Sequence, residues 1–120
     1  MNERHLAKLR DIVNPKIKHS NILGIKVRQE TIDYSIELVN FCSTRNWDRI
    51  NIFSGVRGEL EILVYFEDSY FEVIFNEKNF EFAFSTHVNK GSVIRKAFME
   101  FDKLLIELEN LDDKGNYIQN

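Results

Sequence analysis

The chain has few of the residues that cross-link a small protein or interrupt its secondary structure: one cysteine, one proline and five glycines among 120 residues. A lone Cys42 cannot form an internal disulfide, which excludes a disulfide-stapled secreted scaffold. The longest apolar run, 62–66, has five residues and is too short to span a bilayer. No apolar stretch follows Met1, so we expect no secretory signal, no membrane association and a cytoplasmic location.

Residues suited to catalysis or metal binding are also scarce. The three histidines are dispersed, at positions 5, 19 and 87, and form no metal-ligand spacing with Cys42. Cys42 falls on the apolar stripe of a predicted helix, so a buried inert thiol is a simpler interpretation than a nucleophile paired with His87. Four glutamates alternate with apolar residues, as in any half-exposed strand: Glu59, Glu61, Glu72 and Glu81. We predict no catalytic residue, no metal site and no cofactor, and we favour a non-catalytic protein.

The charge is unevenly distributed along the chain. The net charge is −3, but residues 1–28 sum to +5 and residues 59–113 to −8. This asymmetry fits either contact with nucleic acid or complementarity between the two parts of the chain. No helix-turn-helix is evident, because Pro15 ends the first predicted helix and a long connection follows. The candidate nucleic-acid contacts are Arg4, Lys8, Arg10, Lys16 and Lys18.

Apolar periodicity predicts one domain over residues 1–120. Helical spacing indicates helices at about 3–13, 28–43 and 92–111, with Ser92 as the cap of the last one. Period-two alternation indicates an antiparallel meander of three or four strands at about 49–53, 59–66, 70–75 and 80–86. The polar residues 112–120 are expected to fray. Because one sheet face is strongly apolar and each helix has one apolar stripe, we predict an α+β two-layer sandwich with helices over one face. Most of the ten phenylalanines then serve core packing.

The other sheet face is predicted to be mixed. Carboxylates share it with four apolar or aromatic residues, the candidate interface: Leu63, Tyr65, Tyr70 and Ile74. Such a face suits a dimer interface or a surface that binds another protein. Partial cover by the N-terminal segment is the alternative.

The run from the second helix through Gly58–Tyr65 to Tyr70–Phe75 resembles the layout of some small prokaryotic proteins of uncharacterised function, in which a helix precedes an aromatic-rich meander. The resemblance implies no activity. The many Ile, Asn, Phe and Lys residues indicate an AT-rich genome, such as that of a low-GC bacterium or a phage. We therefore expect a small cytoplasmic protein that acts through protein–protein contact, most simply as a homodimer. The alternative is an accessory nucleic-acid-binding or antitoxin-like regulator that uses residues 1–28.

Overall fold

The computed structural model describes residues 29–54, 59–76, 81–87 and 93–118. The predicted helix over 3–13 and the basic candidates Arg4, Lys8, Arg10, Lys16 and Lys18 lie outside these residues. The described elements, in chain order, are α2 (Gln29–Thr44), β1 (Ile50–Ser54), β2 (Leu60–Tyr65), β3 (Tyr70–Asn76), β4 (Glu81–His87), β5 (Val93–Phe98) and α3 (Phe101–Glu109).

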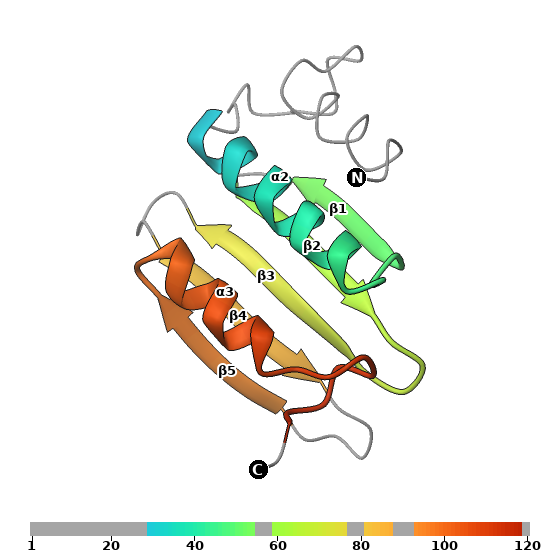
Figure 1. The fold of residues 1–120 in the computed structure, drawn as a ribbon. Helices are drawn as coiled ribbons and strands as arrows, with labels where there is room; N and C mark the ends of the chain where they lie inside the picture. The colour runs from blue at the N-terminus through green and yellow to red at the C-terminus, as the bar shows by residue number, and fades with distance from the viewer. Residues whose placement is uncertain (1–28, 55–58, 77–80, 88–92, 119–120) are drawn as a thin grey trace.

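The strands form one antiparallel sheet of five in the order β1-β2-β3-β4-β5. Both helices lie on the same side of this sheet, α2 toward β1 and β2 and α3 over β4 and β5 (Figure 1). The α+β class and the antiparallel meander are confirmed, and the four predicted strands and the second helix are present within a residue of their predicted ends. No helix in the described part of the chain combines the length and the apolar character needed to cross a membrane.

The prediction of one helix over 92–111 is wrong for nearly its first half, so the sheet has five strands and not three or four, and Glu100 takes the N-cap position that was predicted for Ser92. Residues Val93–Phe98 form β5, which pairs with β4 from Phe82↔Phe98 to His87↔Val93, and the helix begins only at Phe101. Ile94 and Phe98 have helical spacing, yet β-branched residues at the start of this segment also suit a strand. The unpaired edge of β4 supplies backbone hydrogen-bond partners along the whole segment, and this long-range pairing overrides the local periodicity.

Alternate side chains of the strands make the core beneath the helices. On β2 and β3 the buried set is Leu60, Ile62, Val64, Phe71, Val73 and Phe75. The helices cover it with fully buried side chains that include Leu38 and Val39 of α2 and Leu104 and Leu108 of α3. Burying a side chain of this size stabilises the fold by about 1.5–3 kcal/mol. Period-two burial on the strands therefore defines which sheet face the helices occupy.

An aromatic contact joins the two helices across the sheet. The ring of Tyr34 on α2 stacks on Phe101 of α3 with centroids 4.8 Å apart, and it meets Phe82 edge-on at 5.4 Å. Phe75 of β3 also meets Phe82 edge-on, at 5.6 Å. Offset and edge-to-face pairs of this kind each add about 0.5–1.5 kcal/mol beyond the area that they bury. The phenylalanine-rich strands thus hold the helix layer together, in line with the packing interpretation of the aromatic excess.

Helix α2 ends in a left-handed residue. Asn46 has φ of 61°, the Trp47 amide donates to the Cys42 carbonyl at 2.9 Å, and the Asn46 amide donates to Ser43 at 3.1 Å. This is the Schellman pattern, and asparagine tolerates the left-handed conformation better than most residues. The turn places Trp47 in the core at 4% exposure, between the rings of Phe41 and Phe66.

Arg45 connects the ends of the two helices. Its Nη2 donates to the carbonyl oxygens of Glu109, the last residue of α3, at 2.9 Å and of Leu111, two residues further on, at 3.0 Å. The guanidinium lies 5.5 Å from the Phe41 ring centroid and 5.3 Å from that of Trp47. A cation at a helix C-terminus satisfies orphan carbonyls and complements the helix dipole.

The residues after α3 form a turn against the sheet, although the sequence predicts fraying there. The Asp112 side chain accepts from the amides of Lys114 and Asn116 at 2.8 and 3.0 Å, and Leu111 forms a β-bridge with Tyr117. Gly115 has φ of 79°, and a Cβ at this position would overlap the ring of Phe66. Only glycine suits both the backbone conformation and this close approach.

We expect Arg45→Ala to lower the free energy of unfolding by about 2 kcal/mol, because it removes charge-assisted hydrogen bonds to the end of α3 and uncovers Trp47. Urea unfolding followed by tryptophan fluorescence measures this change. Arg49→Ala is the matched control, since exposed Arg49 makes one long contact, 3.5 Å to the Phe66 carbonyl. Equal effects of the two substitutions would contradict the role assigned to Arg45.

Candidate functional site

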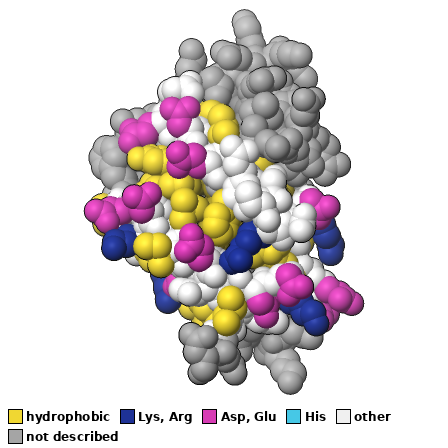
Figure 2. Space-filling view, in the orientation of Figure 1, with side chains coloured by type: hydrophobic (Ala, Val, Ile, Leu, Met, Phe, Trp, Pro, Cys, Tyr) yellow, Lys and Arg dark blue, Asp and Glu magenta, His cyan; other side chains and the backbone are white. Residues whose placement is uncertain are grey.

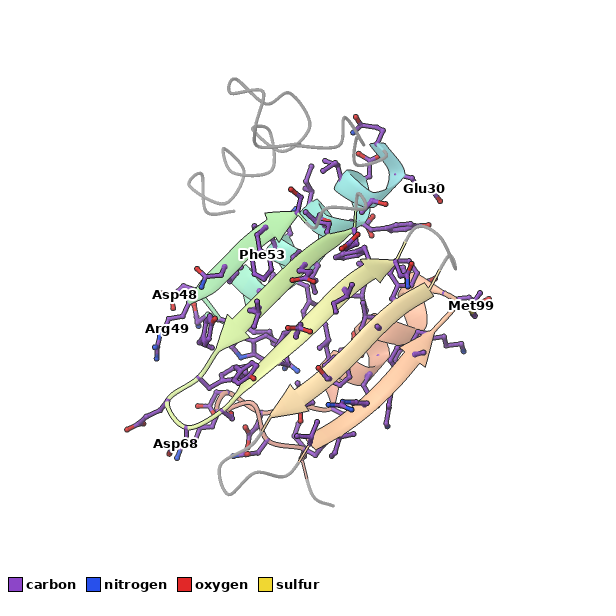
Figure 3. The ribbon with its side chains drawn as sticks, turned by 180° about the vertical axis from the view of Figure 1, so that it is seen from behind. Glu30, Asp48, Arg49, Phe53, Asp68 and Met99 are labelled. Carbon is purple, nitrogen blue, oxygen red and sulfur yellow. The ribbon has the colours of Figure 1, made fainter. Side chains whose placement is uncertain are left out.

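The face of the sheet opposite the helices, here called the open face, has no described element over it (Figure 3). The strand register arranges its side chains in rows that cross the sheet. One row runs through Phe53, Glu61, Ile74, Ala83 and Ala97, and the next through Asn51, Leu63, Glu72, Ser85 and Arg95. In the following row Tyr65 pairs directly with Tyr70. Apolar and charged side chains therefore alternate across a continuous surface.

The four candidate interface residues all lie on the open face and all are half-buried: Leu63, Tyr65, Tyr70 and Ile74. The structure brings the two tyrosines together, with ring centroids 5.8 Å apart, and the Asn51 amide donates to the Tyr65 hydroxyl at 3.4 Å. Leu63 lies opposite Glu72, and Ile74 lies opposite Glu61. The predicted set is thus one patch on β2 and β3, with carboxylates inside it.

Phe53 belongs to this face, and the sequence analysis missed it by assigning the phenylalanines to the core. It lies on β1 with 40% of its side chain exposed (Figure 3). The signal was present, since Ile50 and Ile52 take the buried positions of β1 and leave Asn51 and Phe53 on the other face. Phe53 is therefore the most exposed aromatic residue of the open face within the described part of the chain.

The other half of the open face is hollow. Small side chains on β4 and β5 leave a shallow pocket of about 410 Å³ whose lining includes Glu72, Ile74, Ala83, Ser85, Arg95 and Ala97. The wall toward β3 is formed by Glu72 and Ile74, and Arg95 stands on the β5 side. The open face thus has one half on β1–β3 where large side chains protrude, here called the tall half, and one half on β4–β5 where small side chains leave the pocket, here called the low half.

The open face has carboxylate positions on β2, β3 and β4 and an arginine on its edge strand β5. Glu61 and Glu72 lie on the central strands β2 and β3, and Arg95 lies on the edge strand β5. Partial burial, followed by repulsion from Glu72 and Glu59, raises the pKa of Glu61 above its ordinary value of 4.5. The carboxylates therefore destabilise one another while the face stays open.

No protein-family model, curated protein or solved structure matches this chain. Its candidate function therefore rests on the geometry of its own residues.

The catalytic candidates considered from the sequence are not brought into a site. Cys42 is fully buried in α2, where burial raises the pKa of its thiol to about 12. His87 ends β4 in register with Tyr70 and Val93, and its side chain lies outside the described residues. Across the described ranges, no three His, Cys, Asp or Glu side chains gather as metal ligands.

One ion pair that the sequence did not predict lies on the helix side of the sheet, between an exposed lysine and a buried glutamate. Lys96 of β5 bonds both oxygens of Glu107, whose side chain is 9% exposed, and lies 5.7 Å from the Tyr117 ring centroid. The hydrogen bond to Glu107 raises the pKa of Lys96, and burial together with the Glu107 charge raises the pKa of Tyr117. The pair neutralises a buried carboxylate and fixes α3 to the edge strand, a structural role.

The outer surface of the helix layer is acidic. Figure 2 shows Asp and Glu side chains around hydrophobic ones on this side, and the exposed acidic residues of the helices are Glu30, Asp33, Glu37, Asp102 and Glu109. In this composition it resembles an ordinary solvated surface. The open face is therefore the better candidate for a binding site.

We expect Glu61→Gln to stabilise the protein relative to wild type as the pH rises. A carboxyl whose pKa is raised on folding does not change the free energy of unfolding below its ordinary pKa of 4.5. It lowers that free energy as the pH rises through the raised folded pKa. Urea midpoints of both proteins should therefore coincide in acid and diverge toward neutral pH. Glu67→Gln, in the exposed turn before β3, is the control, and the same divergence for both variants would contradict the burial and repulsion at Glu61.

Proposed function

We propose that this is a non-catalytic cytoplasmic protein of bacterial or phage origin that works through protein–protein contact made by the open face. The observation that carries the proposal is the set of apolar and aromatic side chains left on a sheet face without described cover: Phe53, Leu63, Tyr65, Tyr70 and Ile74. A sheet face that serves only solubility is polar at these positions. An exposed apolar patch rimmed by charges is typical of binding surfaces.

The chemistry of the face favours a protein as the partner. Tyrosine and phenylalanine supply large contact areas at low entropic cost, and they are enriched at the centres of interfaces. Glu61 and Glu72 stand among these rings and would repel a phosphate backbone. The hollow over β4 and β5 is shallow and open, unlike the enclosed pockets that bury most of a small ligand.

Site-specific photo-crosslinking in the native host tests the proposal. A photoreactive phenylalanine analogue replaces Phe53 in one variant and Leu63 in another, and Ile106 in a control. Ile106 is 52% exposed on α3, on the helix side of the protein. We expect discrete protein adducts from positions 53 and 63 and none from position 106. Absence of protein adducts from both open-face positions would contradict the proposal.

A second proposal concerns residues 1–28, whose formal charge of +5 fits non-specific contact with nucleic acid. If this segment binds RNA or DNA, the affinity falls as the salt concentration rises. Replacing Arg4, Lys8 and Arg10 by glutamine then lowers the slope of log affinity against log salt concentration by about 3, when each residue contacts one phosphate. Fluorescence anisotropy with a labelled oligonucleotide measures both effects. Lys103→Gln on the exposed side of α3 is the control. No binding at low salt would remove this function.

A further inference from the structure

We infer that the partner of the open face is a second copy of this chain, packed face to face about a two-fold axis that runs along β3. The inference rests on the proposed function and adds the partner and its orientation. It is carried by the division of the open face into a tall half and a low half, with Glu61 on the tall half and Arg95 on the low half.

The two halves complement each other in shape. Phe53 is an exposed aromatic side chain that protrudes at one edge of the sheet. At the other end of the same row, Ala83 and Ala97 form part of the pocket of about 410 Å³. Two copies of such a surface are complementary when the protruding half of each faces the hollow half of the other.

A rotation about an axis parallel to β3 produces this fit. It places β1 over the second copy's β5 and β2 over its β4, while each row keeps its position along the strands. Phe53 then faces the second copy's Ala97, Glu61 faces Ala83, and Ile74 meets its own counterpart at the axis. Stacked sheets pack about 10 Å apart, so Phe53 fills the hollow that small residues leave.

The charges agree with this orientation. The rotation brings Arg95 of each copy over Asn51 and beside Glu61 of the other, so both carboxylate clusters gain a cation. Two contacts of the arrangement are repulsive: Glu72 on β3 meets its counterpart near the axis, and Glu59 of each copy comes to lie in the row of Glu81 of the other. Glu72→Gln should therefore tighten the dimer, while removal of Arg95 should weaken it.

The face is large enough for a weak or moderate dimer. Five strands at about 4.8 Å spacing, each about six residues long at about 3.4 Å per residue, span about 24 Å by about 20 Å. Two such faces cover about 1,000 Å², which is near the lower limit for a specific interface. A dimer of this size is expected to form at micromolar concentrations.

Pairing through the free edge of β5 fits less well. Antiparallel pairing of two β5 strands within one sheet places residues of the same face opposite each other. In the two registers that pair most of the strand, Arg95 therefore opposes Arg95 or Lys96 opposes Lys96. Like charges directly opposite each other destabilise a strand pair.

Cysteine crosslinking tests the orientation directly. Phe53→Cys and Ala97→Cys are made as separate variants of the full chain, and Cys42 stays in place because its thiol is fully buried. A bis-maleimide whose length matches the gap of about 10 Å between stacked sheets should join positions 53 and 97 in the mixture, and neither variant alone should give a covalent dimer. The double variant should also give covalent dimers, because β1 and β5 are about 19 Å apart within one sheet and the crosslinker cannot span that distance.

Size-exclusion chromatography with light scattering gives the second measurement. Wild-type protein at tens of micromolar should be dimeric, Leu63→Glu should be monomeric, and Arg95→Glu should weaken the dimer about tenfold. The charge swap Glu61→Arg with Arg95→Glu should restore the dimer. Lys103→Glu, exposed on α3 on the helix side of the protein, should have no effect.

The outcomes separate this inference from the proposed function. A monomer at tens of micromolar, or crosslinks of Phe53→Cys with itself in place of the mixed pair, overturns the dimer described here. If photo-crosslinking from positions 53 and 63 then still captures another protein, the open face binds a different partner and only the second copy is excluded. If neither assay gives an adduct, the proposed function fails as well.

Discussion

Burial of every second strand residue beneath α2 and α3 is the constraint on which the rest of the structure depends. Two helices cover one face of a sheet of five strands, so each strand must assign its apolar residues to that face and leave the alternate ones outside. On β2 the sequence Leu60-Glu61-Ile62-Leu63-Val64-Tyr65 does this in six residues. The alternation that buries Ile62 and Val64 therefore leaves Leu63 and Tyr65 half-buried on the open face.

The helix layer is stabilised by contacts between segments far apart in the chain. Arg45, just after α2, bonds carbonyls near the end of α3, and Tyr34 stacks on Phe101 at its start. Trp47 packs against Phe66 and Phe71, so the turn after α2, the core of β3 and the C-terminal turn share one aromatic cluster. These contacts hold the helices on the core face, and none of them extends to the open face.

The parts of the fold that were predictable are those encoded locally. Alternation in 60–65 and 70–76 identified the strands, their faces and the candidate interface residues Leu63, Tyr65, Tyr70 and Ile74. The helix prediction for segment 93–98 is wrong because this strand depends on pairing with β4. The periodicity of a short segment contains no information about a partner that is distant in the sequence. Arg45 and the Lys96–Glu107 pair were missed for a related reason, since their partners are set by tertiary packing.

The sequence also could not reveal that the open face is uneven. Ala83, Ser85 and Ala97 appear ordinary on their strands, and only the register places them side by side, with Ala83 and Ala97 at the far end of the row that begins at Phe53. Once they are adjacent, their small size creates a hollow, and the larger residues on β1–β3 create a ridge. A solvated face requires no such division, because water covers ridges and hollows equally well. Self-association about a two-fold axis along β3 does require this division, because the rotation places the ridge of each copy over β4 and β5 of the other, where the hollow lies. The unevenness of the face is therefore the physical reason to favour a second copy over an arbitrary partner.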